Sequence, residues 1–318
     1  MISLLEKLLV TDRRARYDKE ALAILSQKRL MAKLLKEVVP EVKKYSVEEI
    51  ETFIEGKPKI KKVGVHPNTK ILPRIVGRAT ESKLLGEGTI KFDLWFNLDI
   101  PNISKPIRII INVEAQGKED PGYNLVTRSI YYDCRMVSEQ YETEFFHSNY
   151  DDIKKVYSIW VVMPKKKKEN SVETYSIKRE QNYGKSGSPK DRWDIMASVI
   201  IRLGKNKSKD KNFLNVLSAI FSDTISVEEK LHICEENGET IVDDELVERI
   251  ESMSNLGMAI DEEARAEGLE QGITEGTVKE KAASVVRYAK LGLTPEQIAE
   301  GSDLPIEEVK RILQEANH

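Results

Sequence analysis

Two segments with strict alternation of side-chain character, 89–98 and 107–116, constrain the fold of this chain more than any other feature. Successive residues of a strand point to opposite faces, so each segment has one face made of every second side chain. The short segment 101–106, with a proline at each end, joins them, and the pattern predicts a β-hairpin. Its first strand has Ile90, Phe92, Leu94, Phe96 and Leu98 on one face and Thr89, Lys91, Asp93, Trp95 and Asn97 on the other. Its second strand has Ile107, Ile109, Ile111, Val113 and Ala115 on one face and Arg108, Ile110, Asn112, Glu114 and Gln116 on the other.

Helical and strand patterns on either side of the hairpin predict an α/β fold. An amphipathic helix is expected over 18–39, before Pro40, and a short helix follows whose capping box pairs Ser46 with Glu49. A further strand is expected within 60–85. After the hairpin come a helix over 123–142, a strand over 156–163 buried on both faces, a strand around 172–179 and an apolar stretch over 195–203. This order approaches α-β-β-β-α-β.

The helix expected over 123–142 carries two stripes of side chains at helical spacing. One is apolar and consists of Val126, Ile130, Cys134, Val137 and Tyr141. The other is basic and aromatic and consists of Arg128, Tyr132, Arg135 and Glu139. An amphipathic helix turns its apolar stripe to the core, so the second stripe is expected to form the polar face.

The charge of the chain is unevenly distributed. Its 318 residues have a formal net charge of −3, but residues 223–280 sum to −14 and residues 1–222 to +12. Two lysine-rich runs, 165–168 and 202–211, lie in stretches that are typical of loops and would suit contacts with phosphates. A basic body with an acidic segment is typical of nucleic-acid-binding proteins, although basic residues of this kind also serve simply as solvated surface.

Composition excludes several classes of protein. No apolar run approaches the length of a membrane span, and the N-terminus has no leader-peptide pattern, so neither membrane insertion nor secretion is expected. Cys134 and Cys234 are too far apart in sequence to suggest a disulfide framework, and the four histidines are scattered. A reduced, cytoplasmic protein without a His/Cys metal site is expected.

The chain is predicted to be helical from residue 211 to its end. Gly268, Gly272 and Gly276 recur at four-residue spacing within a long helical segment. Residues 283–314 predict a helix, a turn, a helix, a second turn and a third helix, which resembles a helix-turn-helix DNA-binding unit. The last helix begins with acidic residues that would face phosphates, so a unit that docks a protein or joins copies of this chain is favoured.

Three polar residues of the hairpin form a candidate chemical site. Glu114 and Gln116 are two apart on one strand and point the same way, and Asp93 lies on the antiparallel partner. Two carboxylates in one site repel each other unless a cation lies between them. Oxygen ligands of this kind suit Mg²⁺, Mn²⁺ or Ca²⁺. The alternative is that these residues only form the solvent-exposed face of a half-exposed strand.

Four runs of sequence carry a resemblance to a known family. They are Glu87-Gly-Thr-Ile-Lys-Phe-Asp93, Ile110-Ile-Asn-Val-Glu114-Ala-Gln116, Arg128-Ser-Ile-Tyr-Tyr132 with Arg135 beyond it, and Val156-Tyr-Ser-Ile-Trp160. Together they resemble the PD-(D/E)XK nuclease superfamily, in particular the bacterial PD-(D/E)XK nuclease family transposases, which are related to the Rpn recombination-promoting nucleases. The resemblance covers residues 55–210 and implies a restriction-endonuclease-like α-β-β-β-α-β core with a helical C-terminal region.

The resemblance implies a role for each residue of the site. Asp93 and Glu114 would be ligands of Mg²⁺ or Mn²⁺, with the Ala115 carbonyl as a third. Gln116 stands where many superfamily members have lysine, and because glutamine takes up no proton it would only orient the attacking water or bind the phosphate. Lys91, on the same strand face as Asp93, would then supply the missing charge, or is simply a solvated lysine.

Residues around this site have weaker implied roles. Arg128, Tyr132 and Arg135 would hold neighbouring phosphates, or they form an ordinary polar helix face. Glu87 and Glu37 are candidates for an added acidic ligand, although a turn or surface role is favoured for both.

The implied function is a metal-dependent endonuclease that hydrolyses phosphodiester bonds in DNA, linked to mobile-element recombination or defence. The alternative is a catalytically impaired nuclease fold that binds DNA or a protein. The expected organisation is an N-terminal helical segment at 1–54, a nuclease-like core at 55–210, an acidic helical region at 211–282 and a small C-terminal helical unit at 283–318.

Overall fold

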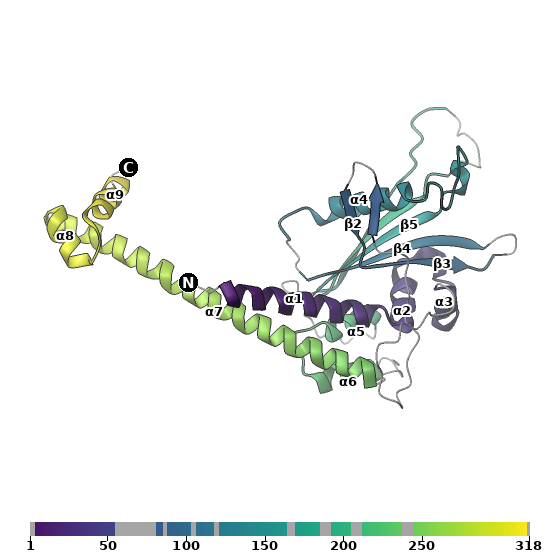
Figure 1. Cartoon of the computed structure of the whole chain (residues 1–318), viewed down its shortest axis with the longest axis horizontal. Helices are drawn as coiled ribbons and strands as arrows, with labels where there is room; N and C mark the ends of the chain where they lie inside the picture. The colour runs from purple at the N-terminus through teal and green to yellow at the C-terminus, as the bar shows by residue number, and fades with distance from the viewer. Residues whose placement is uncertain are drawn as a thin grey trace. The chain divides into compact units, whose positions relative to one another are not determined.

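A computed structural model describes residues 4–54, 81–84, 88–102, 106–117, 121–163, 169–184, 192–204, 212–236 and 244–316. The chain divides into two compact units, Met1–Gly257 and Met258–His318 (Figure 1). Several predicted features lie outside the described residues. They are the lysine-rich runs at 165–168 and 205–211, and residues 60–80 of the window in which a first strand is predicted.

The first unit is built on a five-stranded mixed sheet, which confirms the α/β prediction. Its strand order is β3-β4-β5-β7-β6. The predicted hairpin is present, because β3 and β4 pair antiparallel with Leu94 opposite Val113. β5 lies parallel to both β4 and β7 and is buried on both faces, as predicted. The strands are β3 (Leu94–Ile100), β4 (Ile107–Gln116), β5 (Lys155–Val162), β6 (Ser171–Ser176) and β7 (Met196–Arg202).

The prediction of one continuous strand over 89–98 is wrong. Residues Gly88–Lys91 form β2, which pairs with β1 (Glu81–Leu84) in a separate two-stranded sheet. The chain leaves strand geometry at Phe92 and Asp93 before β3 begins. This interruption changes the alternation, so Phe92 packs on the same side as Trp95, whereas Phe96 and Leu98 face the opposite core. 

The N-terminal helices share one core with the sheet. The helix predicted over 18–39 is interrupted at Ser26 and Gln27, which divides α1 (Leu4–Leu25) from α2 (Lys28–Val38). A short 3₁₀ helix, η1 (Pro40–Val42), leads to α3 (Val47–Phe53). The predicted capping box of α3 is confirmed, because the Glu49 N–H donates to Ser46 Oγ at 3.1 Å and the Ser46 N–H donates to Glu49 Oε2 at 2.7 Å.

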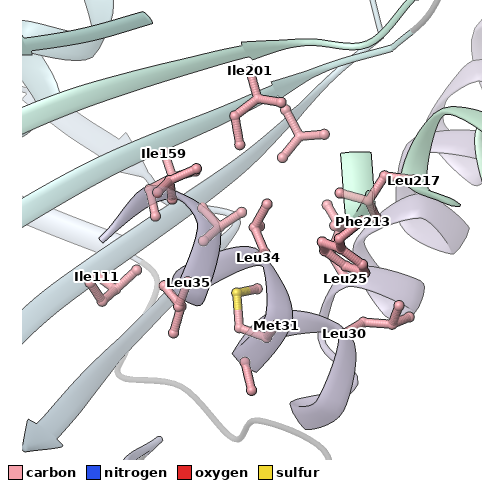
Figure 2. Packing of buried hydrophobic residues seen from close by; sticks show 14 of the residues in the cluster. Leu25, Leu30, Met31, Leu34, Leu35, Ile111, Ile159, Ile201, Phe213 and Leu217 are labelled. Atoms are coloured by element: carbon pink, nitrogen blue, oxygen red, sulfur yellow. The ribbon is translucent and has the colours of Figure 1, made fainter. Parts of the chain in front are cut away.

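Figure 2 shows how this core is filled from three directions. The side chains from α1 and α2 meet one face of the sheet and the side of α5 (Phe213–Ile220). Full burial of each such side chain contributes roughly 1.5–3 kcal/mol. The labelled residues are Leu25, Leu30, Met31, Leu34 and Leu35 from the helices, Ile111, Ile159 and Ile201 from the strands, and Phe213 and Leu217 from α5.

Helix α4 (Leu125–Ser138) covers the other face of the sheet (Figure 1). Only part of the stripe predicted to be apolar contacts the core, because Val126 and Val137 pack against it whereas Ile130 is 41% exposed and Tyr141, beyond the helix end, is 51% exposed. The sheet face under α4 carries polar side chains, so polar residues of the helix can be buried against it with partners. The buried residues of α4 are Leu125, Ser129, Tyr132, Asp133, Arg135 and Met136.

A row of buried polar residues crosses the sheet beneath α4. Asn112, Ser158 and Ser198 lie in register on β4, β5 and β7. Asn112 Nδ2 donates to Ser158 Oγ at 3.4 Å, and the Ser198 hydroxyl donates to Asp133 Oδ2. Asp133 is 2% exposed, and burial raises its pKa to about 7.

We expect Asp133 to make the stability of the chain depend on pH. In the unfolded chain its pKa is about 4, so the folded state binds the proton more tightly. The contribution is complete below about pH 4 and is lost as the pH rises through about 7. Thermal unfolding from about pH 5 to about pH 8 should therefore show a smaller decrease in Tm for Asp133→Asn than for the parent. Equal slopes for the two proteins would contradict this role of Asp133.

The remaining helices confirm the predicted helical C-terminal region. In the first unit α5 is followed by α6 (Val227–Glu236), and α7 (Asp244–Lys290) crosses the boundary between the units. The glycines at 268, 272 and 276 lie exposed within this continuous helix. None of the described helices is both long and apolar enough to cross a membrane. Between α4 and β5 lies the short 3₁₀ helix η2 (Tyr150–Asp152).

The second unit has the predicted order of helix, turn, helix, turn and helix. Val285 of α7, Ile298 of α8 (Pro295–Ser302) and Val309 of α9 (Ile306–Ala316) form its small core. The first turn contains Gly292 at φ +85° and the second contains Asp303 in the left-handed region. The first turn of α9 carries Glu307 and Glu308, as the sequence predicts.

Candidate active site

Asp93 and Glu114 meet where β3 and β4 begin to pair. Leu94 pairs with Val113, so the residue before Leu94 lies across from the residue after Val113. The Asp93 N–H donates to Glu114 Oε1 at 3.1 Å, and the Ala115 N–H donates to Asp93 Oδ2 at 3.1 Å. Each carboxylate is thus held by a backbone group of the neighbouring segment.

Burial changes the protonation of this pair. Glu114 is 5% exposed, and burial, followed by the neighbouring charge of Asp93, raises its pKa to about 8. Burial also raises the pKa of Asp93, against the hydrogen bond from Ala115, which favours the charged form. Near neutral pH the pair therefore tends to retain a proton unless a cation compensates both charges.

The backbone of Ala115 offers a third oxygen at this point. The Gln116 backbone carbonyl accepts a hydrogen bond from the Met163 N–H at 3.0 Å, so the backbone groups of residue 116 point toward β5. The backbone groups of Ala115 point to the opposite edge, where its N–H reaches Asp93. A buried carboxylate (Glu114), a half-buried one (Asp93) and a carbonyl fit the oxygen chemistry of Mg²⁺ or Mn²⁺. Among the described residues, no group of three or more acidic, histidine or cysteine side chains is suited to a metal.

Arg128 lies beside the carboxylate pair in a cage of aromatic rings. Its Nη2 donates to Tyr132 Oη at 2.8 Å, and its Nη1 donates to Tyr123 Oη. The guanidinium carbon lies 4.9 Å from the ring centroid of Tyr123 and 5.2 Å from those of Tyr132 and Trp160. The charge of Arg128 opposes the effect of burial on the pKa of both Asp93 and Glu114.

Buried aromatic residues pack against Tyr132 and Trp160, two of the rings that surround Arg128. The ring centroid of Tyr132 lies 5.3 Å from that of Phe92 and 5.3 Å from that of Trp160, and Phe92 lies 4.7 Å from Trp95. The Trp160 indole donates to Ser158 Oγ at 2.8 Å. Two of the three rings around Arg128, those of Tyr132 and Trp160, are therefore buried and held in place by packing.

The other predicted site residues are placed differently. Gln116 ends β4 on the same face as Glu114 and is half-buried. Lys91 ends β2, and its side chain lies outside what the structure describes. Arg135 lies on the buried face of α4 and is 1% exposed. Glu37 is exposed on α2, and Glu87 lies outside the described residues.

Sequence reasoning missed the aromatic part of the site. Tyr123 lies at the start of the helix predicted over 123–142 and outside both of its stripes, and Phe92 and Trp160 have the pattern of ordinary core residues. A usable signal is the position of Trp160, which pairs with Glu114 across β4 and β5 and therefore shares its face of the sheet.

The site can therefore bind a hard cation through oxygens and an anion through a fixed guanidinium, side by side. Comparison of the chain with family models, with curated proteins and with solved structures gives no match.

Proposed function

We propose that this chain is a metal-dependent endonuclease that hydrolyses phosphodiester bonds in DNA. The observation that carries the proposal is the pair of buried Glu114 and half-buried Asp93, with the Arg128 guanidinium held beside it. A carboxylate pair suited to Mg²⁺ next to a fixed cation fits phosphoryl transfer, in which a metal ion and a positioned cation stabilise the developing charge.

Each residue has a chemical task in this reaction. Asp93, Glu114 and the Ala115 carbonyl would hold Mg²⁺ or Mn²⁺. When bound, the metal would supply Lewis acidity at the phosphate and lower the pKa of the attacking water. Gln116 would orient that water by hydrogen bonding, because its amide cannot accept its proton. Arg128 would bind a phosphate oxygen, with Tyr132 fixing its fork.

The resemblance to PD-(D/E)XK nuclease family transposases supports the same reaction. The hairpin, α4 and the parallel strand β5 follow one another in the order that the resemblance implies. A role in mobile-element recombination or defence is part of this proposal and rests on the resemblance alone. Buried Arg135, proposed from sequence as a phosphate ligand, would have to become accessible to serve as one.

The alternative function is an impaired nuclease fold that binds DNA or a protein without cutting. The observation that favours it is the uncharged Gln116 at a position where many superfamily members have lysine. The two functions differ in whether the purified chain cleaves DNA.

A plasmid-nicking assay separates them. We expect the parent to nick supercoiled DNA with Mg²⁺ or Mn²⁺ but not with EDTA, and Asp93→Ala to abolish nicking. The matched control is Asp99→Ala, on the same hairpin, because Asp99 instead pairs with Arg108 at 2.8 Å. Metal-independent nicking, or full activity of Asp93→Ala, would contradict the nuclease proposal. DNA binding without nicking would favour the impaired fold.

A further inference from the structure

An exposed aromatic ring lies at the edge of the candidate site. Tyr123 is 44% exposed, although tyrosine is large and usually buries much of its ring. The cluster of buried apolar residues under α4, which includes Phe92, Tyr132 and Trp160, does not include Tyr123. The ring is therefore accessible to a ligand and does not belong to this core cluster.

Tyr123 lies between a glycine turn and the capped start of α4. Gly122 has φ +88°, a left-handed conformation that glycine adopts without strain. Asn124 caps α4, since its Oδ1 accepts the Thr127 N–H at 2.9 Å. The capped helix start restrains the backbone on the C-terminal side of the ring, which reduces the entropy lost when a ligand binds to it.

Arg128 connects this ring to the reacting groups. Its guanidinium donates to Tyr123 Oη and lies 4.9 Å from the ring centroid, and the same charge acts on Asp93 and Glu114. A nucleotide with its phosphate at Arg128 would have its base within reach of Tyr123. Every base has a π-face, and stacking on an aromatic side chain contributes about 1–3 kcal/mol per base.

We propose that Tyr123 stacks an unpaired base, so that the preferred substrate is DNA with unpaired nucleotides at the cleavage site. This inference rests on the proposed nuclease function. In a duplex the bases are already stacked and paired, and extruding one costs a few kcal/mol. Single strands, frayed ends and unpaired loops present the base without that cost.

The test measures binding rather than cleavage. Fluorescence anisotropy in EDTA compares a single-stranded oligonucleotide with an abasic strand of the same length, which retains every phosphate. We expect the parent to bind the strand with bases about 5- to 150-fold more tightly, from the stacking energy of one base. Tyr123→Leu should lose this preference, and Tyr123→Phe should restore it.

Tyr131→Leu is the matched control. Tyr131 is 47% exposed on α4, and no contact between it and Arg128 is described. This variant should keep the preference of the parent. A second measurement uses the parent alone, in which the fluorescence of a 2-aminopurine base should change on binding through stacking with Tyr123.

The outcomes separate this inference from the nuclease proposal. Equal binding of the two strands by the parent, or an unchanged preference in Tyr123→Leu, would overturn the stacking role even if metal-dependent nicking is present. A base preference that requires Tyr123, in a protein that never nicks DNA, would support stacking and overturn the nuclease.

Discussion

Glu114→Gln is expected to abolish DNA cleavage while leaving DNA binding intact or tighter. The substitution removes a negatively charged metal ligand, which forfeits several kcal/mol of charge stabilisation and lowers the rate by about 10³ or more. It also removes a carboxylate that repels phosphate, and glutamine keeps the shape and can still accept the Asp93 N–H at the position of Oε1. Cleavage of a labelled DNA and anisotropy binding on the same DNA measure the two effects.

The matched control for this prediction is Glu144→Gln. The Glu144 side chain is 9% exposed and so is nearly as inaccessible as Glu114, but its carboxylate lies 3.7 Å from Arg108 on the hairpin. The control should cleave at close to the parental rate. Cleavage by Glu114→Gln at the rate of the parent would show that Glu114 takes no part in the reaction.

Gln116→Ala is expected to lower the cleavage rate by about 10² to 10³, the size of the loss of one positioned polar group. In the proposed reaction the Gln116 amide, half-buried on the same strand face as Glu114, would orient water or phosphate by hydrogen bonding. Single-turnover cleavage at saturating DNA measures this effect apart from binding. A parental rate for Gln116→Ala would show that Gln116 takes no part.

Gln116→Lys tests whether another residue of the chain supplies the positive charge that many superfamily members have as a lysine at this position. If the site lacks a cation at this position, Gln116→Lys should retain or raise activity. If Lys91 supplies the charge, Lys91→Ala should cost as much as Gln116→Ala, and Gln116→Lys should gain little because two cations would compete for one place. Parental rates for both alanine variants would confine the active site to the carboxylates and Arg128.

The alternation of 107–116 predicted β4 in detail. Ile109, Ile111 and Val113 enter one core while Ile110 and Glu114 face α4, because a strand that separates two layers fixes the direction of every side chain. The pairing of the hairpin followed from the short turn, and with it the meeting of Asp93 with Glu114.

The same pattern could not reveal the interruption at Asp93. The hydrophobic alternation of the sequence runs through 89–98 without a gap, although the chain leaves the strand at 92–93 and Phe92 packs on the side of Trp95. The break has a consequence for the site. The Asp93 N–H is directed to the Glu114 carboxylate at 3.1 Å instead of to a ladder of strand hydrogen bonds.

The buried face of α4 also escaped prediction from sequence. Hydrophobic periodicity favoured a stripe through Ile130 and Cys134, but the helix buries Asp133 and Arg135 instead. That choice depends on polar partners such as Ser198, which lies on a strand far along the sequence. Burial of a polar helix face is favourable only where such partners exist, and a single helix does not show them.

The most direct test of the central claim is to measure Mn²⁺ binding by titration calorimetry without DNA. The parent, Asp93→Ala and Glu114→Gln are compared. The claim is that Asp93 and Glu114 jointly hold one divalent cation. We predict that the parent binds one Mn²⁺ per chain and that each substitution weakens binding by at least about 10- to 100-fold, the cost of disturbing even a supporting group of a metal site. Equal Mn²⁺ affinity in all three proteins would contradict the claim, as would the absence of binding by the parent.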